Sequence, residues 1–168
     1  MVKNKLEKLF SESMHSNNRL WGMKLISNPL THQNTPADYI LDYEIVHPDL
    51  IHQSITVREL IVALVECKHV DCDDGEGGRL AFKRLKQMHD LINFENIRPD
   101  RHRAFFCIAF HETRWDNSEV YMIPVHQMQR FVNEFNKVSM NRDDAKNRFY
   151  RYRVLMHGPL LDLSLLYT

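Results

Sequence analysis

Residues Glu59 to His69 read ELIVALVECKH, and this stretch decides the fold. Six apolar residues run without a break from Leu60 to Val65, which is typical of a strand buried on both faces of an α/β sheet. A buried helix segment is the competing interpretation, but three of the six residues are β-branched and favour a strand. Residues i and i+2 of a strand point to the same face. Glu66 and Lys68 are therefore expected to lie side by side where the strand leaves the core, and charged groups there need a partner, a metal ion or water.

The composition predicts one domain in a reducing compartment. The chain has 168 residues, enough for a substantial core, and its 22 Lys and Arg balance 22 Asp and Glu. No run approaches the roughly 18–20 apolar residues of a membrane span, and the charged N-terminus lacks the apolar segment of a signal peptide. Three cysteines form no even disulfide framework. We expect a protein of the cytoplasm.

The hydrophobic pattern along the chain predicts the order α-β-β-β-α-β-β-α, an α/β fold with a mixed sheet flanked by helices. Helices are expected over residues 3–21 and 79–94 and from Pro124 onward, with strands over 23–26, 37–46, 59–69, 104–110 and 119–123. The strands 37–46 and 59–69 follow one another and are expected to pair as an antiparallel hairpin. The apolar tail, residues 160–168, is expected to dock on the body or on a second copy.

Asp38 begins the strand that precedes the central one. In an antiparallel hairpin the start of the first strand lies beside the end of the second, which places Asp38 near Glu66 and Lys68. Two carboxylates can hold a hard divalent cation through oxygen ligands, and the backbone carbonyl of Cys67 can serve as a further ligand. A cation there would stabilise charge on a phosphate and lower the pKa of a bound water, which Lys68 could orient. The pattern therefore predicts a phosphodiesterase site; the alternative is a salt bridge at the end of a hairpin.

The segments Pro36-Ala37-Asp38 and Glu66-Cys67-Lys68 resemble the PD-(D/E)xK nuclease signature. The likeness extends to Holliday-junction resolvases of the archaeal and RecU-like bacterial and phage kind. It covers about residues 6–135 of a single domain, 1–168, and leaves a basic-aromatic extension over about 139–168. The further matching pieces are Phe10-Ser11-Glu12, Gly22-Met23-Lys24-Leu25-Ile26, Asn28-Pro29, Gln87, Ala104 to Phe110 and Tyr121-Met122-Ile123-Pro124.

This resemblance implies a restriction-endonuclease-like fold and Mg²⁺- or Mn²⁺-dependent cleavage of DNA at four-way junctions. Two symmetric cuts need two active sites, so a homodimer is implied. Asp38, Glu66 and the carbonyl of Cys67 would hold the metal, and Lys68 would be the catalytic lysine. Gln87 would lie at the edge of the site.

Two assignments stay open. Glu12 would be the acid that the first helix adds to the catalytic group, with Glu7 as the other candidate. Asp42 is the alternative to Asp38, because the gap from Asp38 to Glu66 is long for this family and both aspartates share one strand face.

Basic side chains are the candidates for contact with DNA, because cations neutralise phosphates and neighbouring aromatics can stack on bases. The expected contacts are Lys24, Lys83, Arg84, Arg148, Arg151 and Arg153, the last three interleaved with Tyr150 and Tyr152. A solvated helix face is the alternative for the C-terminal cluster, and zero net charge is low for a resolvase. Two other functions remain open: a restriction-like or repair endonuclease of the same fold, and a catalytically inactive DNA-binding protein.

Overall fold

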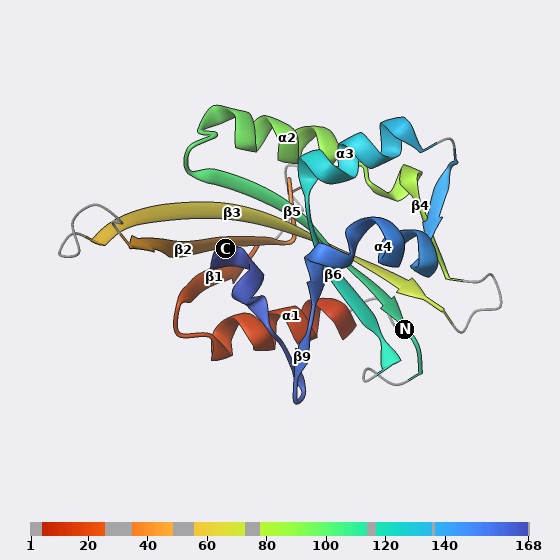
Figure 1. Cartoon of the computed structure of the whole chain (residues 1–168), viewed down its shortest axis with the longest axis horizontal. Helices are drawn as coiled ribbons and strands as arrows, with labels where there is room; N and C mark the ends of the chain where they lie inside the picture. Colours follow the sequence, from red (N-terminus) through yellow and green to blue (C-terminus); the bar gives the residue numbers. More distant parts are fainter. Residues whose placement is uncertain are drawn as a thin grey trace, which may run out of the picture.

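The computed structural model describes residues 5–25, 35–48, 56–72, 78–113, 117–135 and 137–167. Its centre is a six-stranded mixed sheet with helices on both faces (Figure 1). In sheet order the strands are β1 (Leu20–Lys24), β2 (Tyr39–Pro48), β3 (Thr56–Asp71), β5 (His102–His111), β6 (Glu119–Pro124) and β8 (Arg153–Val154). The helices are α1 (Lys5–Ser16), α2 (Met88–Ile97), α3 (Val125–Glu134) and α4 (Arg142–Phe149).

Strand β3 is the central strand, as predicted. It spans 16 residues, pairs antiparallel with β2 and parallel with β5, and so makes the sheet mixed. Helix α2 provides the crossover between the parallel strands β3 and β5. The expected α/β class and the expected β2–β3 hairpin are confirmed.

The apolar run of β3 is buried over only part of its length. Ile61 and Ala63 to Val65 are buried, but the side chain of Leu60 is 53% exposed. This end of the β2–β3 hairpin extends beyond the helices that cover the rest of the sheet (Figure 1). The prediction of a strand buried on both faces therefore holds from Ala63 onward and is wrong at Leu60.

Two hydrophobic cores lie on the two faces of the sheet. One face packs against the apolar stripe of α1, formed by Leu6, Leu9, Phe10 and Met14. The C-terminal tail, which consists of the short strands β9 (Met156–His157) and β10 (Leu160–Leu161) and the 3₁₀ helix η4 (Leu163–Tyr167), buries Leu161, Leu163 and Leu166 in the same core. The tail therefore docks on the body of its own chain. The opposite core contains side chains of α2, α3 and α4.

Helix α1 ends at Ser16, whereas the sequence predicted a helix to residue 21. The reason is that residues from Leu20 form the edge strand β1, which pairs with β2. At Gly22 a Cβ atom would collide with Sδ of Met14 and with the side chain of Leu41. Glycine therefore lets this strand approach the helix closely.

Residues 79–87 do not form an α-helix, although an α-helix was predicted over 79–94. Strand β4 (Arg79–Ala81) pairs with β7 (Ser139–Asn141), and the 3₁₀ helix η1 (Phe82–Arg84) follows. Pairing with β7 lets Leu80 reach the core, where it is fully buried, and this tertiary contact overrides the helical spacing of the apolar residues. The helix α2 begins only at Met88.

The C-terminal segment is part of the domain. The basic-aromatic region contains helix α4, followed by the 3₁₀ helix η3 (Tyr150–Tyr152), and β8 then pairs with β6. Within the described ranges, no helix is long and apolar enough to cross a membrane. The matching piece at Asn28-Pro29 lies outside the described residues.

Candidate active site

The β2–β3 hairpin brings Asp38 to the end of the apolar run of β3, beside Val65 and Cys67. Tyr39 lies opposite Val65 in the register of the hairpin. The backbone N–H of Asp38 donates to the carbonyl oxygen of Val65 at 3.0 Å. The carboxylate oxygen Oδ2 of Asp38 accepts the backbone N–H of Cys67 at 2.7 Å. The predicted neighbourhood of Asp38 and the Glu66-Cys67-Lys68 segment is thus present.

Glu66 and Lys68 form a contact within this group. Glu66 is buried, with 4% of its surface exposed. Nζ of Lys68 lies 2.5 Å from Oε1 of Glu66 and 3.4 Å from Oε1 of Gln87, the residue that precedes α2. Gln87 therefore lies at the edge of the group, as the sequence predicted.

Burial is the main reason why the pKa values of both carboxyl groups are raised. The pKa of Glu66 is raised to about 7, because burial and the charge of Asp38 together outweigh the lowering effect of the hydrogen bond from Lys68. Burial likewise raises the pKa of Asp38, against the lowering effect of the bond from Cys67 N–H. Neighbouring carboxyl groups with raised pKa values are typical of functional sites. A cation bound between them would favour the charged form of both groups.

The acid that α1 brings to this group is Glu7. Its side chain pairs with Lys24, at the end of β1. Lys24 donates a hydrogen bond to the carboxylate of Glu7, which raises the pKa of Lys24, and the charge of Asp38 raises it as well. The hydroxyl of Tyr39 donates to the backbone carbonyl of Glu7 at 2.7 Å and ties this turn of α1 to β2.

Glu12 and Asp42 lie elsewhere. Glu12 is exposed and lies 3.8 Å from Lys8 in an ion pair along the helix surface. The structure therefore corrects the choice of Glu12 in favour of the alternative, Glu7. Asp42 lies opposite Val62, four residues before Glu66, and lines a cleft with Trp21. Asp38 is the aspartate that the structure brings to Glu66 and Lys68.

Two predicted DNA-binding residues lie near Lys68 and Gln87, beside the carboxyl pair. Lys83 and Arg84 form η1, just before Gln87, and both are exposed. Nη2 of Arg84 donates to the backbone carbonyl of His69 at 2.9 Å, next to Lys68. Together with Lys24 near Asp38, this arrangement puts basic side chains on both sides of the carboxyl pair.

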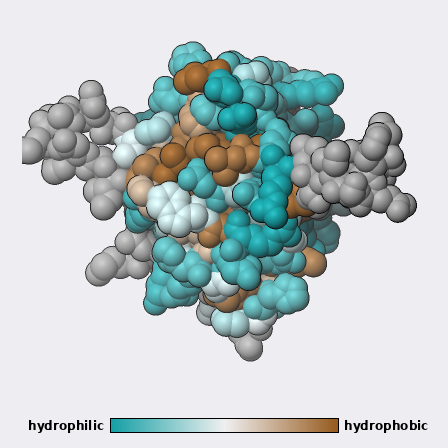
Figure 2. All heavy atoms as spheres, turned by 90° about the vertical axis from the view of Figure 1, so that its left-hand side faces the viewer, coloured by the Kyte–Doolittle hydropathy of each residue, from teal (hydrophilic) through white to brown (hydrophobic). Residues whose placement is uncertain are grey.

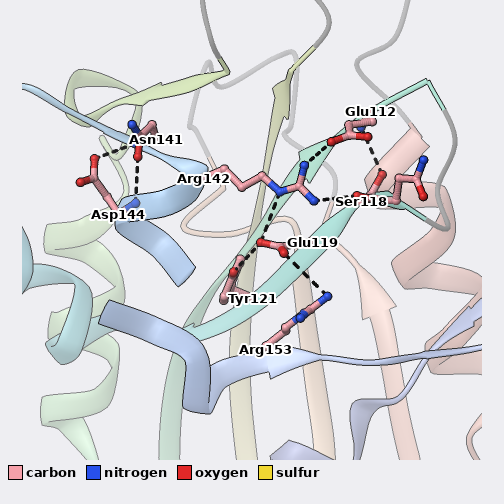
Figure 3. Close-up of polar contacts among 9 residues, drawn as sticks. Glu112, Ser118, Glu119, Tyr121, Asn141, Arg142, Asp144 and Arg153 are labelled. Carbon is pink, nitrogen blue, oxygen red and sulfur yellow. Dashed lines mark hydrogen bonds and ion pairs between the residues drawn. The ribbon is translucent and has the colours of Figure 1, made fainter. Parts of the chain in front are cut away.

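Arg153 lies in a separate polar cluster around a buried acid, Glu119 (Figure 3). Oε2 of Glu119 accepts a hydrogen bond from the hydroxyl of Tyr121 at 2.8 Å and lies 3.4 Å from Nε of Arg142. Oε1 of Glu119 lies 3.7 Å from Nη2 of Arg153. Arg142 also contacts Glu112, so the cluster joins β6, α4, β8 and the chain after β5. Arg153 therefore balances a charge within the chain.

The remaining predicted cations of the C-terminal segment are exposed. Arg148 lies 3.0 Å from Glu134 in an ion pair between α4 and α3. The Nε of Arg151 donates to the hydroxyl of Tyr150 at 3.3 Å, and its guanidinium lies over the ring of Tyr150. The structure does not bring these two arginines to the carboxyl pair.

The donor set at the candidate site fits a hard divalent cation. Across the described ranges, no group of three or more His, Cys, Asp and Glu side chains is arranged to hold a metal. The protein ligands would accordingly be two carboxylates, Asp38 and Glu66, and the backbone carbonyl of Cys67. Mg²⁺ is commonly held by one or two carboxylates, with water and substrate phosphate completing its six ligands. Both carboxyl groups have raised pKa values in the absence of a cation, so they hold protons more readily than usual. A bound cation would favour their charged forms and release those protons.

Neither the scan against models of known protein families nor the search of curated proteins found a match to this chain.

Proposed function

We propose that this chain is a Mg²⁺- or Mn²⁺-dependent endodeoxyribonuclease with a restriction-endonuclease-like fold and a PD-(D/E)xK active site. One observation carries the proposal. The hairpin fastens Asp38 to Cys67, between Glu66 and Lys68, through a 2.7 Å hydrogen bond. Two carboxyl groups and an ammonium group, from segments 28 residues apart, thereby form one cluster at the end of a buried strand.

The residues of this cluster have separate tasks. Asp38, Glu66 and the carbonyl of Cys67 would hold the divalent cation, which supplies charge stabilisation at the scissile phosphate and an acidified water. Lys68, held by Glu66 and Gln87, is positioned to donate a hydrogen bond to the attacking water or to a phosphate oxygen. Glu7 of α1 would hold Lys24 near Asp38 through their ion pair, outside the set of metal ligands.

DNA is the substrate that the surrounding charge favours. Lys24 on one side and Lys83 and Arg84 on the other can neutralise phosphates on both sides of the scissile bond. Net charge is zero over the whole chain, so the positive charge must act locally. We propose a four-way junction as the natural substrate and the cytoplasm, a host's if a phage encodes the chain, as the place of action.

Symmetric cutting of a junction requires two copies, and we propose that they meet on the outer face of β1, β2 and β3. Large apolar side chains are exposed here: Trp21 by 58%, Met23 by 47%, Val46 by 44% and Leu60 by 53%. The pairing register puts them on one face of the sheet. On the side of the molecule where these strands lie, hydrophobic residues form a band bordered by hydrophilic residues (Figure 2).

The charges around this apolar surface favour a second copy as its partner. Asp42 and Glu44 line the cleft beside Trp21 together with Arg19, and Arg58 pairs with Glu44 across the hairpin. A surface with both signs of charge is complementary to itself under a two-fold axis, because each acid can face a base of the other copy. Among the described residues, strand β1 is also an edge of the sheet, where a strand of a second copy could pair.

The substrate is tested with a labelled four-way junction and a linear duplex of the same sequence, each with Mg²⁺ or Mn²⁺. Paired symmetric nicks in the junction alone support a junction resolvase. Cutting of both substrates supports the restriction-like or repair endonuclease instead. Tight binding without cutting of either substrate contradicts the nuclease and supports an inactive DNA-binding protein.

A further inference from the structure

A second cleft lies toward the other end of the sheet from the active site. It has a volume of about 380 Å³ and is lined by residues of β2, β5, β6, η3 and the tail. Tyr43 of this cleft lies opposite Ile61. Ile61 precedes Glu66 by five residues, which separates the cleft from the carboxyl pair by roughly 16 Å along β3.

The walls of this second cleft are apolar and aromatic. Ile45, Phe105 and Met122 come from three strands of the sheet, and Tyr152 of η3 and the tail residue Leu166 also line the cleft. Phe105 and Tyr152 are half-buried, so part of each ring faces the cleft or the solvent. Aromatic rings in such a position can stack on a flat ligand.

Positive charge dominates the polar part of the cleft. Two of its lining residues are Arg103 and Arg151, and one is an acid, Glu95. The acid is already engaged: its carboxylate accepts the backbone N–H of Ala104 at 2.8 Å and lies 2.6 Å from Nε2 of His126. The two guanidinium groups are therefore the charges that the cleft offers to a ligand.

Arg103 is held in place by the backbone. Its Nη1 donates to the carbonyl oxygens of Pro99 at 2.8 Å and of His102 at 2.9 Å. A guanidinium group has five N–H donors, so the N–H groups of the other two nitrogens of Arg103 remain able to bind a ligand. A fixed guanidinium loses little freedom on binding, which favours recognition of a phosphate.

We propose that this cleft binds a nucleotide, with the base between the aromatic side chains and the phosphate at Arg103 and Arg151. The volume lies within the range of about 300–1,000 Å³ that is usual for sites of small ligands. The ligand is a free nucleotide or an unpaired nucleotide of a nucleic-acid strand, which share the same chemistry. This inference goes beyond the proposed nuclease and does not depend on cleavage.

The test measures binding by calorimetry in EDTA, with the full-length Glu66→Ala variant, so that a failure of the proposed nuclease activity does not affect the result. The probes are thymidine monophosphate, thymidine, inorganic phosphate and a short oligothymidylate. We expect the monophosphate to bind at least about tenfold more tightly than thymidine or phosphate alone. Tighter binding of the oligothymidylate identifies a strand as the ligand, whereas equal binding identifies a free nucleotide; both support the cleft.

Variants assign the binding to this cleft. Tyr152→Leu and Arg151→Ala should each weaken the monophosphate about tenfold or more, since a stacked base or a charged contact is lost. Tyr152→Phe keeps the ring and should retain the affinity. Arg98→Ala removes an exposed arginine outside the cleft, one that pairs with Asp100, and should change nothing. Absence of monophosphate binding, or equal losses in Arg98→Ala and Arg151→Ala, would overturn the proposal.

Discussion

The carboxylate of Asp38 accepts the backbone N–H of Cys67 at 2.7 Å. Cys67 stands between Glu66 and Lys68, whose side chains leave β3 on one face. A single hydrogen bond therefore fixes the first carboxylate relative to the second and to the lysine. The geometry of the candidate active site depends on the register of the β2–β3 hairpin, which ten consecutive residue pairs hold.

Asp38→Asn should reduce cleavage at least about 100-fold, because the amide cannot supply the charge that a metal ligand needs. Asp42→Asn should leave the rate within about threefold of wild type, since Asp42 lies opposite Val62, away from Glu66. Single-turnover cleavage of a four-way junction measures both. An inactive Asp42 variant beside an active Asp38 variant would reverse the assignment.

Glu7→Gln should lower cleavage by about tenfold or more, because Lys24 loses its charged partner beside Asp38. Glu12→Gln is the matched control on the same helix. Its side chain is exposed and pairs only weakly with Lys8, so the rate should stay unchanged. The same cleavage assay compares the two variants, and a larger loss in Glu12→Gln would restore Glu12 as the acid of α1.

The metal-free protein should become less stable as the pH rises from about 5 to 8. The pKa of Glu66 is raised from 4.5 to about 7, so in this window the folded chain holds a proton that the unfolded chain has released. The free energy of unfolding then falls with pH, by about 3 kcal/mol at most. Asp38, whose pKa is also raised, acts in the same direction. Urea unfolding in EDTA at several pH values measures this slope.

Glu66→Gln should flatten the pH dependence, because an amide stays neutral at every pH. The variant should match wild type near pH 5 and exceed it near pH 8. Mg²⁺ should stabilise wild type at pH 8, since it binds the folded chain, and should have little effect on the variant. A wild-type stability that increases from pH 5 to pH 8 would contradict the raised pKa of Glu66.

Leu60→Arg should convert a dimer to a monomer, because it places a charge within the exposed apolar surface of β1, β2 and β3. Ile97→Arg is the control: Ile97 is 67% exposed at the end of α2, away from this surface. Light scattering at several protein concentrations measures the mass of each variant. A wild type that stays monomeric at all concentrations would argue against paired cleavage of a junction.

The sequence predicted the central hairpin and the grouping of Asp38, Glu66 and Lys68 because the necessary signals are local. The apolar run ending in Glu66-Cys67-Lys68 identifies β3, and antiparallel pairing then brings the start of β2 beside its end. Gln87 was also predicted at the edge of the group, and it lies there.

The choice between Glu7 and Glu12 needed more than local signals. Seen down the axis of α1, Glu7 lies at the edge of the buried stripe, on the same side of the helix as Met14. Glu12 lies farther from the stripe. Helical spacing therefore favours Glu7 once the stripe is known. Which acid reaches Asp38 still depends on how α1 sits on the sheet. That position is set by tertiary packing, including the bond from Tyr39 to the carbonyl of Glu7.

A long-range contact explains the error over residues 79–87. Residues 79–81 form a strand because residues 139–141 pair with them, and apolar spacing alone cannot reveal a partner so distant in the chain. Arg153, a predicted DNA contact, lies 3.7 Å from a buried acid on a neighbouring strand, Glu119. A local cluster of basic residues gives no sign of such a partner.

Cleavage of a labelled four-way junction with Mg²⁺ or Mn²⁺, by wild type, Glu66→Ala and Glu134→Ala, tests the central claim most directly. Glu134 is an exposed carboxylate of α3, outside the proposed dimer surface, and serves as the matched control. The account predicts metal-dependent cutting by wild type and Glu134→Ala and none by a folded Glu66→Ala. Equal cutting by all three proteins would contradict the assignment of the active site to Asp38, Glu66 and Lys68.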